Sequence, residues 1–107
     1  MSAETKALID RAGFVARANG NLFKGKVGAA VAAVRRAGAV HVVEGIMRMY
    51  LISHMIIPGS SYWNLGIGLD EKDVAGDEEG NENMLNLGKS IHLLATATAP
   101  YRNEWPG

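Results

Sequence analysis

A run of eight uncharged residues, all apolar or glycine, constrains this chain more than any other stretch. It extends from Val27 to Val34 and is followed by a basic pair. A short continuous apolar run between turn signals is typical of a strand buried on both faces, although periodicity alone does not exclude a helix. The length of the run and the flanking glycines Gly25 and Gly38 favour the strand.

An amphipathic segment begins at Ala39, directly after this run. A buried strand that leads through a short loop into a helix is the repeating unit of parallel α/β sheets. In such sheets, ligands bind beyond the carboxyl ends of the strands. The pattern therefore predicts a ligand site at the loop from Arg35 to Gly38.

Regular hydrophobic spacing predicts three helices in the chain. They run from about Ala3 to Ala18, from about Ala39 to Ser53, and, after a cap at Asp77, to about Ala97. The apolar stripe of the second helix is expected to comprise Val40, Val43, Met47, Tyr50 and Leu51. That of the last helix is expected to comprise Met84, Leu87, Ile91 and Leu94, with Leu85 and Leu93 beside it.

The other segments complete an α-β-α-β-α order. Residues Met55 to Ile57 are predicted to form a second short buried strand that ends at Pro58. Residues 59 to 76 are glycine-rich without periodicity and are expected to form a long loop. Residues 99 to 107 are expected to be an extended tail, because Pro100 and Pro106 discourage a helix.

Two parallel strands and three helices do not make a complete sheet. Both strands have the composition of central strands, yet each would leave an edge without a neighbour. We therefore expect either that the chain pairs with another copy or that it is the second half of a larger open sheet.

Composition excludes several classes of function. The 11 basic residues balance the 11 acidic ones, so no net field favours nucleic acid or an anionic membrane. There is no cysteine for disulfides or thiolate metal sites, which is compatible with a reducing cytoplasm. The three histidines lack metal-ligand spacing, so no metal site is expected. No signal peptide and no apolar run long enough to span a membrane are visible.

Three motifs together carry a family resemblance. They are the Arg35-Arg36-Ala37-Gly38 loop, His54, and the segment Pro58-Gly-Ser-Ser-Tyr-Trp63. With them, the chain resembles the NADPH-dependent FMN reductase family, which includes iron-sulfur flavoproteins and multimeric quinone reductases with a flavodoxin-like fold. The resemblance covers about residues 2 to 97. It implies that the segment entered at Lys24 is the fourth strand of that fold, and that the segment beginning at Ser53 is the fifth.

The sequence departs from the family pattern at one important place. The phosphate-binding loop after the first strand and a second flavin loop are absent from these 107 residues. The resemblance therefore implies the C-terminal half of a flavodoxin-like, doubly wound parallel sheet. Residues 1–98 would be the partial domain and residues 99–107 its tail.

The resemblance also implies which residues bind a cofactor. Arg35, Arg36, Ala37 and Gly38 would lie along the isoalloxazine ring of FMN, where backbone N–H groups and an arginine stabilise negative charge. A solvated basic turn is the alternative for this loop. His54 would approach the flavin, as a histidine does in related quinone reductases. Alternatively, it is a cation at a helix C-terminus.

Aromatic residues follow in the glycine-rich loop. Ser61, Tyr62 and Trp63 would form the mouth of the substrate site, since adjacent aromatic side chains can wall a planar ligand. Anchoring of the long loop onto the core is the alternative.

Two functions from different classes remain. The first is an FMN-dependent NAD(P)H oxidoreductase module that passes electrons to a quinone, free flavin or another small acceptor; the cofactor carries the chemistry, and no residue is assigned as catalytic. The second is a non-catalytic half-domain that acts through self-association or by docking to a missing N-terminal half. Under both hypotheses we expect the chain to associate, because the sheet edges need cover.

Overall fold

The computed structural model describes residues 1–34, 38–60, 65–67 and 77–107 of the chain. Its elements are the helix α1 (Ala3–Ala18), the strand β1 (Ala32–Val34), the helix α2 (Ala39–Ile52), the strand β2 (Leu65–Ile67), the helix α3 (Glu78–Thr98) and the 3-10 helix η2 (Ala99–Glu104). Helix and strand alternate in the predicted order. The three α-helices lie within one residue or so of their predicted bounds.

The helix starts agree with the prediction because capping is a local interaction. The Ser2 hydroxyl accepts a hydrogen bond from the Thr5 N–H at 3.1 Å at the start of α1. The Asp77 carboxylate accepts one from the Gly80 N–H at 3.0 Å at the start of α3. Each side chain satisfies a backbone donor that the helix itself leaves unpaired.

The apolar run from Val27 to Val34 is not helical. Val27 forms an isolated parallel bridge with Ile56, and β1 pairs in parallel with β2. At the bridge, the Gly28 N–H donates to the Ile56 carbonyl and the Ile56 N–H donates to the Lys26 carbonyl, both at 2.9 Å. The expectation of a strand is confirmed in the parallel pairing, although only the last three residues form a regular strand.

The prediction of the second strand was wrong in its position. Within Met55 to Ile57, only Ile56 pairs, and the regular strand is β2, inside the segment predicted to be a loop. The bridge joins Val27 to Ile56, 29 positions later, and the strand pair joins Ala32 to Leu65, 33 positions later. Between Ile56 and Leu65 the chain therefore has four residues more than between Val27 and Ala32. Pro58 lies in this interruption and has no N–H to donate to a ladder.

The prediction of an extended tail was also wrong for most of its length. Ala99–Glu104 form the 3-10 helix η2, with Pro100 in its first turn. Proline is tolerated there because the first N–H groups of a helix have no internal acceptor and its fixed φ is already helical. Only residues 105–107 continue beyond this helix, and we call them the tail.

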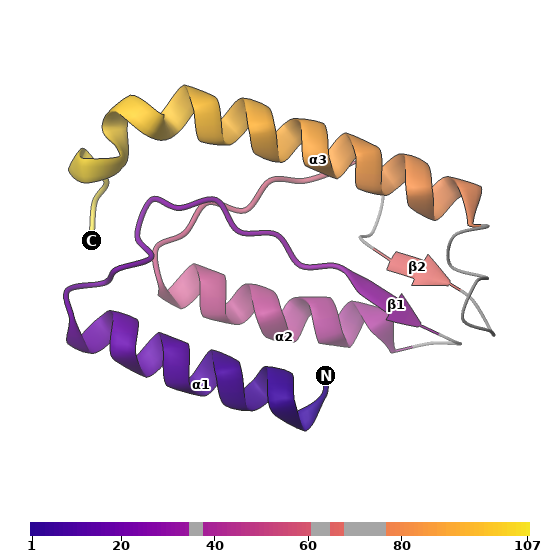
Figure 1. Ribbon diagram of the computed structural model, residues 1–107, viewed down its shortest axis with the longest axis horizontal. Helices are drawn as coiled ribbons and strands as arrows, with labels where there is room; N and C mark the ends of the chain where they lie inside the picture. The colour runs from indigo at the N-terminus through magenta and orange to yellow at the C-terminus, as the bar shows by residue number, and fades with distance from the viewer. Residues whose placement is uncertain (35–37, 61–64, 68–76) are drawn as a thin grey trace.

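The elements form layers that are visible in Figure 1. The strand pair lies between α2 on one side and α3 on the other, and α1 lies on the outer side of α2. α2 packs against β1, and α3 packs against β2. The chain measures 43 × 31 × 17 Å along its principal axes.

The core of the described part of the chain is small. Its buried apolar side chains are Ala16, Ala30 and Leu87, and its buried polar ones are Ser53 and Asn83. The predicted stripe of α3 is confirmed at Leu87, with Leu85 and Leu93 exposed beside it. The stripe of α2 is less buried than predicted, because Val40 and Leu51 are exposed.

Candidate functional site

Of the four residues predicted to line the cofactor, Arg35 to Gly38, the structure describes Gly38. It caps the N-terminus of α2 with φ +94° and ψ −4°, in the left-handed region. A Cβ atom at this position would meet nothing within 4 Å, so glycine is required here by the backbone and not by lack of space. Gly38 leads directly into α2.

The N-terminus of α2 is open to an anion or a polar ring edge. Its N-cap residue Gly38 has no side chain to cap it, and its first turn contains no acidic residue. The first N–H groups of a helix lack internal acceptors, and the helix dipole places partial positive charge there. Because Gly38 follows β1 closely, this positive end lies at the carboxyl end of the sheet, where ligands bind in parallel α/β folds.

Several predicted site residues lie outside the described residues. Arg35, Arg36 and Ala37 are in the segment between β1 and Gly38, and Ser61, Tyr62 and Trp63 are in the segment that precedes β2. Their proposed contacts with a flavin stay predictions that rest on sequence.

His54 is not brought together with Gly38. The two residues lie beyond opposite ends of α2, which has 14 residues and is about 20 Å long at 1.5 Å per residue. A helix that connects two parallel strands runs back along the sheet, so the residues before and after it lie at opposite sheet ends. The prediction that grouped His54 with the loop did not take this return path into account.

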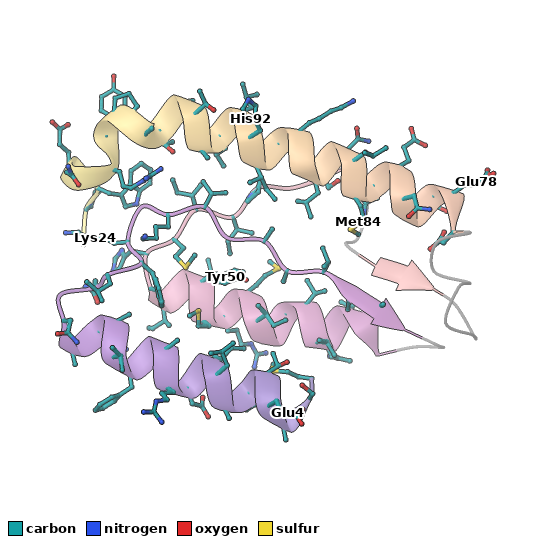
Figure 2. All side chains as sticks on the ribbon, viewed as in Figure 1. Glu4, Lys24, Tyr50, Glu78, Met84 and His92 are labelled. Carbon is teal, nitrogen blue, oxygen red and sulfur yellow. The ribbon has the colours of Figure 1, made fainter. Side chains whose placement is uncertain are left out.

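His54 contacts the tail instead. Its backbone is in the left-handed region with φ +55°, and its carbonyl accepts a hydrogen bond from the Gly25 N–H at 2.9 Å. A Cβ atom on Gly107 would lie 2.8 Å from Cγ of the His54 ring, so the last residue packs directly on the imidazole. Lys24 Nζ donates to the Gly107 backbone oxygen at 3.0 Å, and Figure 2 shows Lys24 beside this end of the chain.

Tyr50 makes a polar contact that was not predicted. The sequence pattern placed it only in the apolar stripe of the second helix. Its hydroxyl donates to the Ala29 carbonyl at 2.9 Å, and its ring lies against Gly28. Figure 2 shows Tyr50 on α2. Burial raises the pKa of the Tyr50 hydroxyl above its usual 10.0. A tyrosine within an apolar stripe is itself a signal for such a bond, since a buried hydroxyl needs a partner.

Replacing Tyr50 with phenylalanine is expected to lower the free energy of unfolding by about 1 kcal/mol at neutral pH, the usual net value of a hydrogen bond. Because the folded pKa is raised, the wild type keeps this stabilisation below about pH 10 and loses it as the pH rises through the folded pKa. Urea unfolding at about pH 8 and about pH 10.5 measures both effects. The Tyr101→Phe variant changes an exposed tyrosine and should behave as wild type. An equal alkaline loss in wild type and Tyr50→Phe would contradict the assignment.

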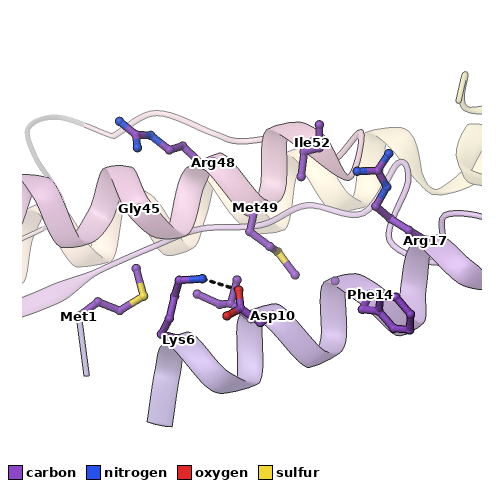
Figure 3. Close-up of a pocket in the computed structure, with 11 residues that line it drawn as sticks. Met1, Lys6, Asp10, Phe14, Arg17, Gly45, Arg48, Met49 and Ile52 are labelled. Atoms are coloured by element: carbon purple, nitrogen blue, oxygen red, sulfur yellow. Dashed lines mark hydrogen bonds and ion pairs between the residues drawn. The ribbon is translucent and has the colours of Figure 1, made fainter. Parts of the chain in front are cut away.

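A groove of about 550 Å³ lies between α1 and α2 (Figure 3). Its apolar lining comes from Ile9, Phe14, Met49 and Ile52, among others. Lys6 and Asp10 form an ion pair within α1 at its edge. None of the predicted site residues lines this groove.

Metal-binding clusters and membrane-spanning helices are both absent from the described ranges. There, no group of three His, Cys, Asp or Glu side chains is placed to hold a metal ion. Among the same residues, no helix is long and apolar enough to cross a membrane.

A parallel strand-helix-strand unit with a glycine turn at the strand's carboxyl end is typical of α/β proteins that bind nucleotide cofactors. A match to a known family defines the class more narrowly than this fold pattern does. Residues 1–70 match the family described as NADPH-dependent FMN reductase, and the chain belongs to this family. The predicted resemblance is thereby confirmed, and the family implies a flavodoxin-like fold. Comparisons with curated proteins and with solved structures find no match.

Proposed function

We propose that this chain is an FMN-dependent NAD(P)H oxidoreductase module of the flavin or quinone reductase type. The family match over residues 1–70 carries the proposal, and it indicates FMN and NADPH at the level of the family. The matched region contains both predicted site segments and Gly38. When bound, FMN would accept hydride from the nicotinamide and pass electrons to a small acceptor.

The N-terminus of α2 fits one edge of a flavin ring. Its first N–H groups, for which Gly38 provides no side-chain cap, and the absence of acid in its first turn favour a ligand edge that carries negative charge. The open space above Gly38 leaves the backbone accessible to a flat ring. Arg35 and Arg36, adjacent in sequence, would add positive charge beside the same edge.

The remaining site residues have different proposed roles. Ser61, Tyr62 and Trp63 would form the mouth through which nicotinamide and acceptor enter. His54 is not part of the proposed flavin contacts, because α2 separates it from Gly38. Its contacts with Gly25 and Gly107 support an anchoring role for the tail. From the absence of cysteine we further propose a cytoplasmic location.

The Gly38→Ala variant is expected to bind FMN at least about tenfold more weakly than wild type, a loss of about 1.4 kcal/mol. Alanine pays about 1–2 kcal/mol in the left-handed region and would move the backbone that faces the ring. Titration of FMN into the full chain, followed by flavin fluorescence, measures the affinity. The Gly20→Ala variant is the control, because Gly20 has φ +84° in an open turn far from this loop.

Two results would count against the flavin proposal. One is a wild-type chain that stays colourless and leaves FMN fluorescence unchanged at millimolar FMN. The other is an equal FMN affinity for wild type and Gly38→Ala.

A second candidate is a non-catalytic half-domain that acts through self-association or by docking to a partner half. The small core favours it, since the buried apolar side chains of the described part are two alanines and one leucine. Colour after FMN addition and the mass of the purified chain distinguish the two candidates.

A further inference from the structure

The groove between α1 and α2 combines an apolar lining with positive charge. Ile9 on α1 and Met49 and Ile52 on α2 contribute apolar surface, and two arginines, Arg17 and Arg48, also line it. Every residue that lines the groove belongs to the described part of the chain. Its volume of about 550 Å³ is within the range of about 300–1,000 Å³ that is typical of small-molecule sites. The groove is therefore large enough for a ligand of its own.

The two arginines have different surroundings. Figure 3 shows Arg48 extending from α2 on the side away from α1, and Glu44 lies one turn before it on the same helix. Arg17 extends from α1 toward α2. Among the described residues, neither an ion pair nor a side-chain hydrogen bond reaches the Arg17 guanidinium. Asp10, the acid of the groove lining, is paired with Lys6. The N–H donors of Arg17 are thus open to an anion.

Arg17 can recognise a carboxylate beside an apolar surface. A planar guanidinium donates two parallel hydrogen bonds to a carboxylate, which gives direction as well as attraction. Arg17 also lies in the last turn of α1, where a cation interacts favourably with the helix dipole, and that interaction leaves its side-chain donors available. Aliphatic and thioether side chains line the groove next to it. This combination favours a ligand with an anionic head and a hydrocarbon chain.

The length of the apolar stretch sets the length of the chain. Ile9 and Arg17 are eight residues apart on α1, which corresponds to about 12 Å at 1.5 Å per residue. An extended alkyl chain advances about 1.25 Å for each carbon–carbon bond of about 1.5 Å, so about ten carbons cover this distance. Phe14, with 76% of its surface exposed, lines the same stretch. Met1 lies at the opposite end of the groove from Arg17 (Figure 3), so this stretch is formed by the two helices alone.

We propose that the groove between α1 and α2 binds a medium-chain alkanoate of about ten carbons. Its carboxylate accepts hydrogen bonds from the Arg17 guanidinium, and its chain lies along Ile9, Met49 and Ile52. Binding covers apolar surface that is open in the unliganded chain, since Ile52 has 59% of its surface exposed. The site is separate from the proposed flavin site, because Ile52 ends α2 whereas Gly38 precedes its first residue. The inference does not depend on FMN.

Titration of decanoate into the full chain without FMN tests the proposal. Amide chemical shifts of isotopically labelled protein at about pH 7.5, where a carboxylic acid is ionised, give both the affinity and the location. We expect saturable shifts in the residues of α1 and α2 that line the groove, and none in α3. Butanoate supplies the head without the chain, and decylammonium supplies the chain with the opposite charge. Both are expected to bind at least about tenfold more weakly than decanoate.

Two pairs of exposed residues provide matched variants. Arg17→Gln is expected to weaken decanoate binding about fivefold, whereas Arg11→Gln removes an exposed arginine of the same helix outside the groove and should bind as wild type does. Ile52→Gln is also expected to weaken binding about fivefold, because the chain loses apolar contacts. Leu8→Gln changes an exposed aliphatic residue outside the groove and should leave the affinity unchanged.

Several results would overturn the proposal. The absence of saturable shifts at millimolar decanoate would exclude the site. Equal binding of decylammonium and decanoate, or equal losses in Arg17→Gln and Arg11→Gln, would show that Arg17 does not hold the carboxylate. Shifts of the same amides that grow with protein concentration before decanoate is added would assign the groove to a second copy of the chain. Because FMN is absent from these titrations, none of these results bears on flavin binding.

Discussion

Replacing Leu87 with alanine is expected to lower the free energy of unfolding by about 2–5 kcal/mol. Leu87 has only 3% of its surface exposed, and the other buried apolar side chains of the described part are the alanines Ala16 and Ala30. Removal of its branched end leaves a cavity in the core, and the small side chains of Ala16 and Ala30 do not replace the apolar contacts that are lost. A small domain is stable by about 5–15 kcal/mol in total, so the loss is a large share of the whole.

Leu85 provides a matched control on the same helix. It lies two positions before Leu87 and has 67% of its surface exposed, so Leu85→Ala should change stability by less than about 0.5 kcal/mol. Urea unfolding followed by far-ultraviolet circular dichroism gives both values. Equal losses for the two variants would show that α3 does not bury the face described for it.

The buried face of α3 was only partly predictable from sequence. Periodicity identified Leu87, because apolar residues recur at three- and four-residue spacing along this helix. It did not identify Asn83, which is 2% exposed and continues the same stripe. The Ser60 hydroxyl donates to the Asn83 carbonyl at 2.7 Å and so connects the segment after α2 to α3. A polar residue on a buried stripe gives no hydrophobic signal, and the bond from Ser60 to the Asn83 backbone joins residues 23 positions apart.

The difference between local and non-local interactions also explains why the helix starts were predicted correctly and the second strand was not. Helix starts at Ser2 and Asp77 were predictable because the capping side chain lies within three residues of the N–H it satisfies. The second strand was predicted at the wrong position. Whether the segment at Ile56 or the one at Leu65 forms the regular strand depends on its pairing with the first strand, which is a non-local interaction. A short apolar triplet carries no information about its partner.

The candidate site could be predicted from sequence only in part. Gly38 was predictable, because a glycine between a buried strand and a helix marks the turn at the sheet's carboxyl end. The resemblance grouped His54 with Gly38, whereas the structure places the two residues beyond opposite ends of α2. The helix between them is long enough to span the sheet, and counting its residues separates the two positions. Family resemblance supplied a pair that the path of this chain does not bring together.

The contact of the tail with Gly25 is the part of the fold that sequence reasoning missed entirely. Gly25 is buried with φ +75°, and its N–H bonds the His54 carbonyl. A Cβ atom there would lie 2.8 Å from Cβ of Trp105 and 2.9 Å from its Cγ. Trp105 therefore sits directly on the entry to the apolar run, where it joins the tail to the start of the first strand segment.

The Gly25→Ala variant is expected to lose about 2–5 kcal/mol of unfolding free energy. Left-handed backbone costs alanine about 1–2 kcal/mol, and displacing a packed side chain costs about 1–3 kcal/mol more. Gly20→Ala separates the two effects, because Gly20 has φ +84° but nothing within 4 Å of a Cβ atom, and it should lose only the first. In a Trp63→Phe background, the emission of Trp105 should shift to longer wavelength in Gly25→Ala and stay unchanged in Gly20→Ala. Equal stability losses with unchanged emission in both would mean that Trp105 does not pack on Gly25, and that the tail leaves the strand entry uncovered.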